Sequence, residues 1–182
     1  MGKLHDAIDE ALASFLQRQH LFFVGTAPLR AEGHVNVSPK GRDSFAVLDP
    51  HTVAYVDFTG SGIETVAHVR ENGRIVLMFC AFEEPPRIVR LHGVGEAVEA
   101  DDPEFEELRR QLPAHEDVRA IVRVRLTRIS DSCGYGVPLY DYRGERQQLS
   151  KWAERKGAEG IREYRAKNNA RSIDGLPGLR RR

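Results

Sequence analysis

The segment Thr59-Gly60-Ser61-Gly62 is where the sequence comes closest to a recognisable chemical site. It lies between a strand-like run and a helical pattern. Ser61 and Glu64 have the spacing of a capping box, which predicts that a helix begins there. Backbone N–H groups in a first helical turn bind anions, and glycine lets the backbone approach a ligand closely. The stretch from Asp57 to Thr65 therefore predicts a seat for a phosphate. The alternative is a helix start that is only capped, which stabilises a helix by about 1 kcal/mol.

This predicted seat has no cation of its own, since no Lys or Arg lies between Thr59 and Thr65. The charge of a phosphate would have to be met by backbone dipoles and by a cation from elsewhere in the chain. Lys40, Arg87 and Arg90 are the candidates for that cation.

A second segment, from His34 to Gly41, has polar residues on one side. Alternation places Asn36, Ser38 and Lys40 together on a short strand, with Val37 and Pro39 between them, and Pro39 is expected to break the ladder. One interpretation is an edge that offers backbone groups, a hydroxyl and a cation to a planar polar ligand. The other is an ordinary polar strand face with a solvated lysine, which spacing alone slightly favours.

A third segment, Cys133–Arg143, is rich in glycine and tyrosine and has Trp152 downstream. Such a cluster could wall an aromatic ligand. A packed surface loop or one arm of a subunit interface explains it as well.

Several common chemistries leave no trace in the sequence. The glycine pairs lack the further glycine of a dinucleotide fingerprint, and Thr59 stands where a nucleophile elbow needs its first glycine. The seven histidines have neither helical pairing nor a cysteine at zinc spacing, so no metal site is predicted.

Composition limits the possible partners. The 27 basic and 27 acidic residues cancel, which argues against a protein that binds nucleic acid or membrane surfaces in bulk. No apolar run is long enough to span a membrane, and no signal-peptide core is visible, so we expect a cytoplasmic protein with two free cysteines. Arg180, Arg181 and Arg182 predict a solvated tail.

The elements that must position these segments follow from periodicity. An amphipathic helix is predicted over residues 3–17 and a short acidic helix over 102–111. Strands are predicted over residues 21–26, 35–38, 45–48, 52–58, 74–82, 87–99 and 118–129. Residues 74–82 are almost continuously apolar, which predicts a central strand buried on both faces. The pattern favours a closed or nearly closed antiparallel barrel in a single domain, residues 1–182. Its helical C-terminal extension, from about residue 145, consists of segments near 145–156 and 158–168 and then an extended or mobile end.

The order of these motifs resembles the pyridoxamine 5′-phosphate oxidase-like flavoproteins of the FMN-binding split β-barrel. The likeness runs from about Leu4 to Trp152 and includes the segments Val35–Gly41, Asp57–Gly62, His68–Gly73, Arg74–Phe82 and Gly134–Pro138. One departure is plain: oxidases proper carry an Arg-Lys pair in the phosphate-binding segment, where this chain has Ile63-Glu64-Thr65.

The resemblance implies a mainly β fold with flanking helices, a six-stranded antiparallel split barrel. It also implies a homodimer with FMN in a groove between the subunits. In the family, the segment matching Asn36–Gly41 lies along the flavin ring, and the segment matching Asp57–Thr65 holds the ribityl phosphate. The late aromatic loop reaches the site from the other subunit, and Trp152 is expected to belong to the cofactor site with it.

These features predict an FMN-dependent oxidoreductase with a small-molecule substrate and a nicotinamide as its electron donor. Lys40 would lie near the electron-rich edge of the ring, where a cation stabilises reduced flavin; no catalytic acid or base is assigned. A deazaflavin-dependent reductase of the same fold is one alternative. A flavin-binding protein used for storage or sensing, without turnover, is another.

Overall fold

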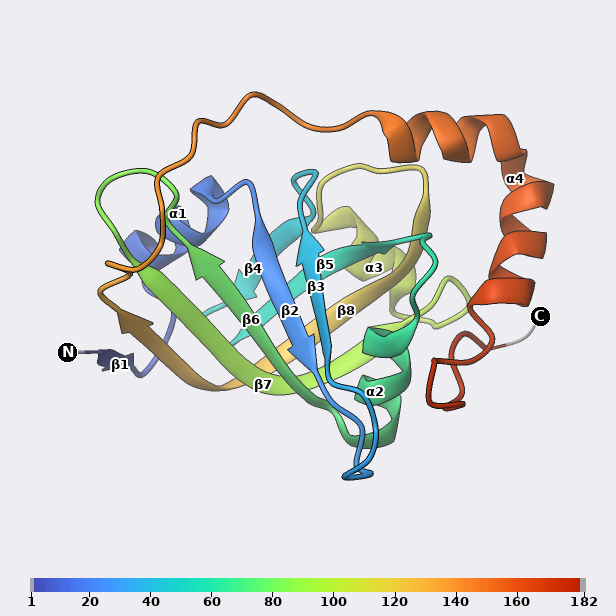
Figure 1. Cartoon of the computed structure of the whole chain (residues 1–182), viewed down its shortest axis with the longest axis horizontal. Coiled ribbons are helices and arrows are strands. Elements are labelled where there is room, and N and C mark those ends of the chain that lie inside the picture. The colour runs from blue at the N-terminus through green and yellow to red at the C-terminus, as the bar shows by residue number, and fades with distance from the viewer. Residues whose placement is uncertain (1, 181–182) are drawn as a thin grey trace.

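Eight strands form one antiparallel sheet that curls into a barrel in the computed structural model, which describes residues 2–180 (Figure 1). The sheet has the order β3-β2-β6-β7-β8-β5-β4, with β1 paired to β8. The strands are β1 (Lys3–His5), β2 (Phe22–Thr26), β3 (Asn36–Lys40), β4 (Phe45–Asp49), β5 (Thr52–Phe58), β6 (Arg74–Cys80), β7 (Ile88–Val98) and β8 (Val118–Ser132). The predicted class is confirmed, although the sheet has eight strands and not six.

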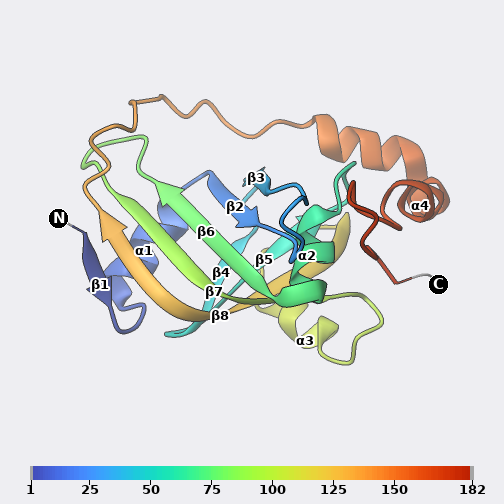
Figure 2. The same ribbon diagram turned by 60° about the horizontal axis from the view of Figure 1, so that its bottom comes forward.

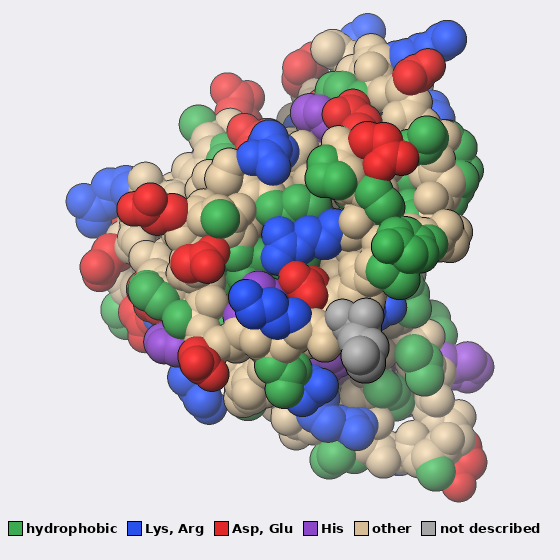
Figure 3. All heavy atoms as spheres, turned by 90° about the vertical axis from the view of Figure 1, so that its left-hand side faces the viewer, with side chains coloured by type: hydrophobic (Ala, Val, Ile, Leu, Met, Phe, Trp, Pro, Cys, Tyr) green, Lys and Arg blue, Asp and Glu red, His purple; other side chains and the backbone are tan. Residues whose placement is uncertain are grey.

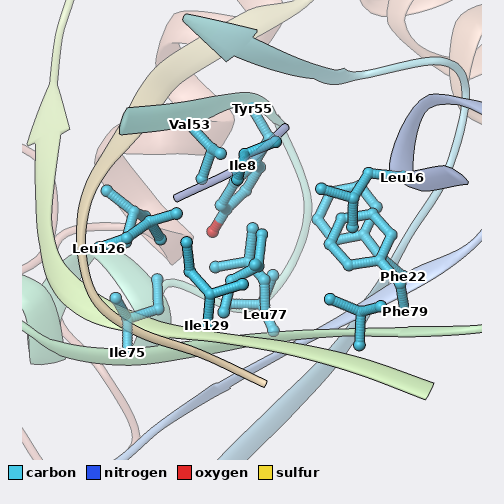
Figure 4. Packing of buried hydrophobic residues seen from close by; sticks show 14 of the residues in the cluster. Ile8, Leu16, Phe22, Val53, Tyr55, Ile75, Leu77, Phe79, Leu126 and Ile129 are labelled. Carbon is cyan, nitrogen blue, oxygen red and sulfur yellow. The ribbon is translucent and has the colours of Figure 1, made fainter. Parts of the chain in front are cut away.

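The barrel interior is filled by apolar side chains that alternate along the strands. Phe22, Tyr55, Leu77 and Phe79 are almost completely buried, and they converge with Leu16 of the first helix (Figure 4). Burying one such side chain contributes about 1.5–3 kcal/mol, so this cluster is the main source of the stability of the barrel.

The first helix differs from its prediction. The chain begins with β1, whose Lys3 and Leu4 pair with Asp131 and Ser130 of β8, and only then forms α1 (Glu10–Arg18). Asp9 caps this helix by accepting a hydrogen bond from Leu12 N at 2.8 Å. The predicted single helix over residues 3–17 is therefore wrong at its start, because pairing with a distant strand outweighs the local helical pattern.

Two strand predictions also need correction. Pro39 does not break the ladder, because β3 is an edge strand of the sheet and runs through Pro39 opposite Phe23. β6 is central between β2 and β7, but only one of its faces is buried in the barrel. Val76 and Met78 lie on the other, partly exposed face.

Three further helices surround the barrel. α2 (Glu64–Asn72) packs against β2, β6 and β7, and α3 (Phe105–Arg110) packs against β8. α4 (Gln148–Asn168) bends at Gly157, whose φ of 65° interrupts the helix, as the two predicted helical segments require. No helix within residues 2–180 is long and apolar enough to cross a membrane.

The end of the chain is anchored to the barrel. Residues after α4 run beside α2 in both ribbon views (Figures 1 and 2). Arg180 pairs with Asp101 and Asp102, so this member of the predicted solvated tail is bound to the protein. Arg181 and Arg182 lie outside the described residues.

Candidate anion and cofactor site

The carboxylate of Asp57, at the end of β5, lies at the centre of the candidate site. It is fully buried and binds two cations: Lys40 Nζ donates to Oδ1 at 2.9 Å, and Arg119 Nε donates to Oδ2 at 2.8 Å. Burial raises the pKa of Asp57, but the charges of Arg119 and Lys40 outweigh burial and hold that pKa below its usual value. Asp57 is therefore ionised, and it acts on a ligand only through these two cations.

Arg119 also fixes the loop between β5 and α2. Its Nη1 donates to the carbonyl oxygens of Gly60, at 3.2 Å, and Gly62, at 2.8 Å. Both carbonyls therefore face the guanidinium group. Within residues 2–180, the backbone N–H groups of residues 60–65 donate no hydrogen bond to the protein. These donors are unused, as an anion seat requires.

The predicted capping box does not form. α2 begins at Glu64, its N-cap is Ile63, and no side chain caps it, while Ser61 is exposed. The Glu64 carboxylate accepts a hydrogen bond from Ile173 N at 3.2 Å instead. The end of the chain thus takes the carboxylate that a capping box would use.

A polar network connects β3 to the first turn of α2. Asn36 Nδ2 donates to Thr65 Oγ1 at 3.0 Å and to Thr26 Oγ1 at 3.2 Å, and Ser38 Oγ donates to Asn36 Oδ1 at 3.1 Å. Thr26 Oγ1 in turn lies 3.0 Å from Nδ1 of His68. The network holds the polar face of β3 against the start of α2, so the two segments that the sequence predicts to contact one ligand are adjacent.

His68 is the buried end of this network. Its side chain is fully buried in α2, and its Nε2 has no hydrogen-bond partner among the described residues. Burial lowers the pKa of His68, and the nearby acids, Asp174 first, oppose that effect. His68 is therefore a neutral side chain at neutral pH.

The extension beyond β8 supplies two further residues to the loop. Arg165 Nε donates to Thr59 Oγ1 at 2.9 Å, and Asn169 Nδ2 donates to Gly60 O at 2.9 Å. This contact covers one side of the loop and buries Thr59, while Ser61 and Gly62 stay exposed. The loop is thus open to solvent on one side only.

A separate cavity of about 800 Å³ lies outside the barrel, between α1, the β6–β7 turn and the segment after β8. Aromatic side chains line much of it, among them Phe15, Phe23, Phe82 and Tyr140. Tyr142 stacks on His20 with 3.6 Å between the ring centroids. Figure 3 shows this end of the molecule, with hydrophobic side chains gathered among basic and acidic ones. Arg87 and residues 140–143 of the predicted aromatic loop line this cavity, whereas none of the predicted residues of β3 and of the β5–α2 loop does.

Comparison with known proteins gives the family. The family model described as pyridoxamine 5′-phosphate oxidase matches residues 8–133. A protein of Aspergillus flavus, the pyridoxamine 5′-phosphate oxidase family protein ustO, is 42% identical over 98% of this chain and 78% of its own length. The chain belongs to the pyridoxamine 5′-phosphate oxidase family.

Solved structures agree at the level of the fold. HupZ from Group A Streptococcus is 22% identical with a TM-score of 0.53, covering 67% of this chain and 91% of its own. A putative pyridoxamine 5′-phosphate oxidase from Lactobacillus delbrueckii is 21% identical with a TM-score of 0.54, covering 70% of this chain and 98% of its own. The split-barrel architecture is therefore shared, whereas Arg165 and Asn169 lie beyond the residues that the family model matches.

The structure gathers most of the residues predicted for the cofactor. Asn36, Ser38, Lys40, Asp57, Thr59, Gly60 and Thr65 belong to the two linked networks, and Ser61 and Gly62 form the exposed part of the loop. Val37 and Pro39 point to the outer side of β3, where Val37 is 65% exposed. Trp152 lies apart: its ring meets Tyr164 within α4 at 4.9 Å, and no described contact joins it to the loop.

The cations differ from those predicted. Lys40 is in place, but Arg87 pairs with Asp131 and Arg90 donates to Ser132 Oγ, away from the loop. Arg119 and Arg165 stand there instead. The sequence indicated Arg119 only weakly as a site residue. It lies on the polar face of an alternating strand, and a barrel partly encloses that face. No pattern in the sequence indicated Arg165, because 106 residues separate it from Thr59.

Proposed function

We propose that the protein binds FMN at the β5–α2 loop and along β3, and acts as an FMN-dependent oxidoreductase. One observation carries the proposal: Arg119 and Arg165 bind a loop whose N–H groups are unused, and Lys40 shares the carboxylate of Asp57 with Arg119. The Glu64 carboxylate also lies against Gly62, so the three cations exceed the two acids, and positive charge next to free backbone donors suits a phosphate. Membership of the family adds independent support for a flavin.

The residues on β3 suit the ring of such a cofactor. Asn36 and Ser38 present a polar face fixed by their own hydrogen bonds, so little ordering entropy is lost when a ligand binds. Lys40, held by Asp57, places its ammonium group at the end of that face. A bound flavin would supply hydride transfer, while these side chains would bind and orient it and bias it towards the reduced form.

We also propose a homodimer with the cofactor groove between its subunits. Support comes from two exposed apolar side chains: Val37, on the outer side of the edge strand β3, is 65% exposed, and Val35, just before that strand, is 72% exposed. The segment after β8 is exposed as well, with Tyr135 at 82% and Tyr140 at 64%. Analytical ultracentrifugation tests this: a dimer is expected, and Val37→Glu should shift it to monomer. A wild-type monomer at high micromolar concentration would exclude it.

Titration of apo-protein tests the cofactor. Quenching of flavin fluorescence should show saturable binding of FMN. Titration with a 5-deazaflavin phosphate in the same assay measures the affinity for the alternative cofactor. Absence of binding at high micromolar FMN would reject the proposal. Loaded protein supplied with NADH or NADPH and an artificial acceptor should turn over. Tight binding without turnover would instead indicate storage or sensing.

A further inference from the structure

Arg165 connects the extension to the candidate phosphate loop. It lies in the second half of α4, where its Nε donates to Thr59 Oγ1 and its Nη2 donates to Val118 O, both at 2.9 Å. These two bonds use two of the five N–H groups of a guanidinium. The remaining donors are free to bind a ligand at the loop.

The charge of Arg165 has no carboxylate partner within ion-pair distance among the described residues. Asp117 and Asp57 are the two nearby acids that raise the pKa of Arg165, and both already have cationic partners. Asp117 pairs with Arg42 at 2.9 Å, and Asp57 pairs with Arg119 and Lys40. Burial lowers the pKa of Arg165, and the charge of Arg119 lowers it further. A partly buried cation in this position gains stability when an anion binds beside it.

Asn169 gives a second, independent sign of a ligand. Its side chain is fully buried against the loop through the bond to Gly60 O, yet its Oδ1 has no hydrogen-bond partner among the described residues. A buried acceptor without a donor is costly.

We propose that Arg165 is the residue that selects for a phosphate ester at this loop. Arg165 thereby replaces the basic pair that is absent from Ile63-Glu64-Thr65. The ligand class is a phosphomonoester, and the inference rests on the proposed function, in which the loop holds the phosphate of the cofactor.

A purely structural role is the competing explanation, since Arg165 also joins α4 to β8. Arg42 provides a matched control. It binds Asp117 and donates to Ser150 Oγ at 2.9 Å, so it also joins α4 to the barrel, but it makes no described contact with the loop. Ser150→Ala removes this bond to α4 and keeps Asp117 paired with Arg42, so it should loosen α4 without altering phosphate recognition.

The experiment compares FMN with riboflavin, which lacks the phosphate, in titrations of wild-type, Arg165→Gln and Ser150→Ala apo-protein. The ratio of the two dissociation constants isolates the phosphate. We expect wild type to favour FMN by roughly tenfold to a hundredfold, as charge-assisted hydrogen bonds allow. In Arg165→Gln the ratio should fall towards one through weaker FMN binding, with riboflavin affinity unchanged. In Ser150→Ala the ratio should stay at the wild-type value.

Three results would overturn the inference. If wild type favours FMN and Arg165→Gln keeps that preference, Arg165 does not select the phosphate, although the proposed function stands. If both variants lose the preference equally, the docking of α4 is responsible. If wild type binds neither ligand, the proposed function fails and the inference fails with it. Should Arg165→Gln not fold, Arg165→Lys decides: it keeps a cation and should retain most of the preference.

Discussion

The barrel and the C-terminal extension are held in different ways. The barrel, largely the residues that the family model matches, encloses a continuous apolar cluster in which Leu77 and Phe79 have no exposed surface. The extension from residue 134 onward contains α4, which has no buried residue, and it meets the barrel through polar side chains such as Arg165 and Arg180. Folding free energy thus comes mainly from the barrel.

The candidate site lies where these two regions meet, and this location is informative. A loop fixed from the barrel side by Arg119 and from the extension side by Asn169 can change its ligand preference through the extension alone. Each of these hydrogen bonds contributes about 0.5–1.5 kcal/mol, well below what the apolar cluster of the barrel contributes.

Removing the central carboxylate of the barrel should be the most damaging change. Asp57→Ala leaves Lys40 and Arg119 without their counter-charge, which typically costs about 3–5 kcal/mol. Urea unfolding followed by circular dichroism measures the loss. Asp174→Ala is the control from the extension, because its partner His34 is exposed, and it should change stability by less than Asp57→Ala does. Equal losses in the two variants would mean that the extension stabilises the fold as strongly as the barrel does.

An apolar truncation in each region sharpens the same comparison. Leu77→Ala opens a cavity in the barrel and should cost about 2–5 kcal/mol. Ile173→Ala, in the extension, removes a side chain that is 69% exposed and should cost less than about 0.5 kcal/mol. Thermal unfolding of both variants gives the answer. A large loss for Ile173→Ala would show that this side chain is buried in solution, for example by a second subunit.

Acid should weaken the barrel through His68. Because burial lowers the pKa of His68 in the folded state, the unfolded chain takes up this proton first as the pH falls below about 6.5. Stability from the neutral imidazole is therefore present above that pH and is lost as the pH falls through the folded pKa. Melting temperature measured from neutral to mildly acidic pH should fall more steeply in wild type than in His68→Gln. Identical slopes would contradict the burial of a neutral His68.

The smallest effect is expected at the end of the extension. Arg180 pairs with Asp101 and Asp102, but its side chain is 46% exposed. Arg180→Ala should cost less than about 1 kcal/mol, because solvent screens such pairs. Limited proteolysis should nevertheless cut the last residues faster than in wild type, since their anchor is gone. Unchanged proteolysis would show that Arg70, which binds Gly178 O and Glu99, suffices to hold them.

Local patterns in the sequence predicted much of the barrel. Alternation from Val118 to Leu126 identified β8, and the polar face of Asn36, Ser38 and Lys40 identified a strand that does face the candidate site. These predictions succeed because side-chain periodicity along one strand depends on that strand alone.

Long-range pairing explains the failures. The helical pattern at Lys3 yields to pairing with Asp131, and the capping box of Ser61 yields to a donor from Ile173. The cations at the loop come from Arg119 and Arg165, which only the folded chain brings near Gly60. No local rule contains this information, because each contact depends on where a distant segment lies.

The free edge of β3 has a consequence for the behaviour of the protein in concentrated solution. A strand with one unpaired side is a template on which foreign strands can stack into fibrils, and Val35 and Val37 make this one attractive. Pro39 lacks an N–H group and so interrupts the template near its end. Replacing Pro39 with a β-branched residue would lengthen the edge that can pair with another strand. Pro39 therefore limits self-association through β-strand pairing.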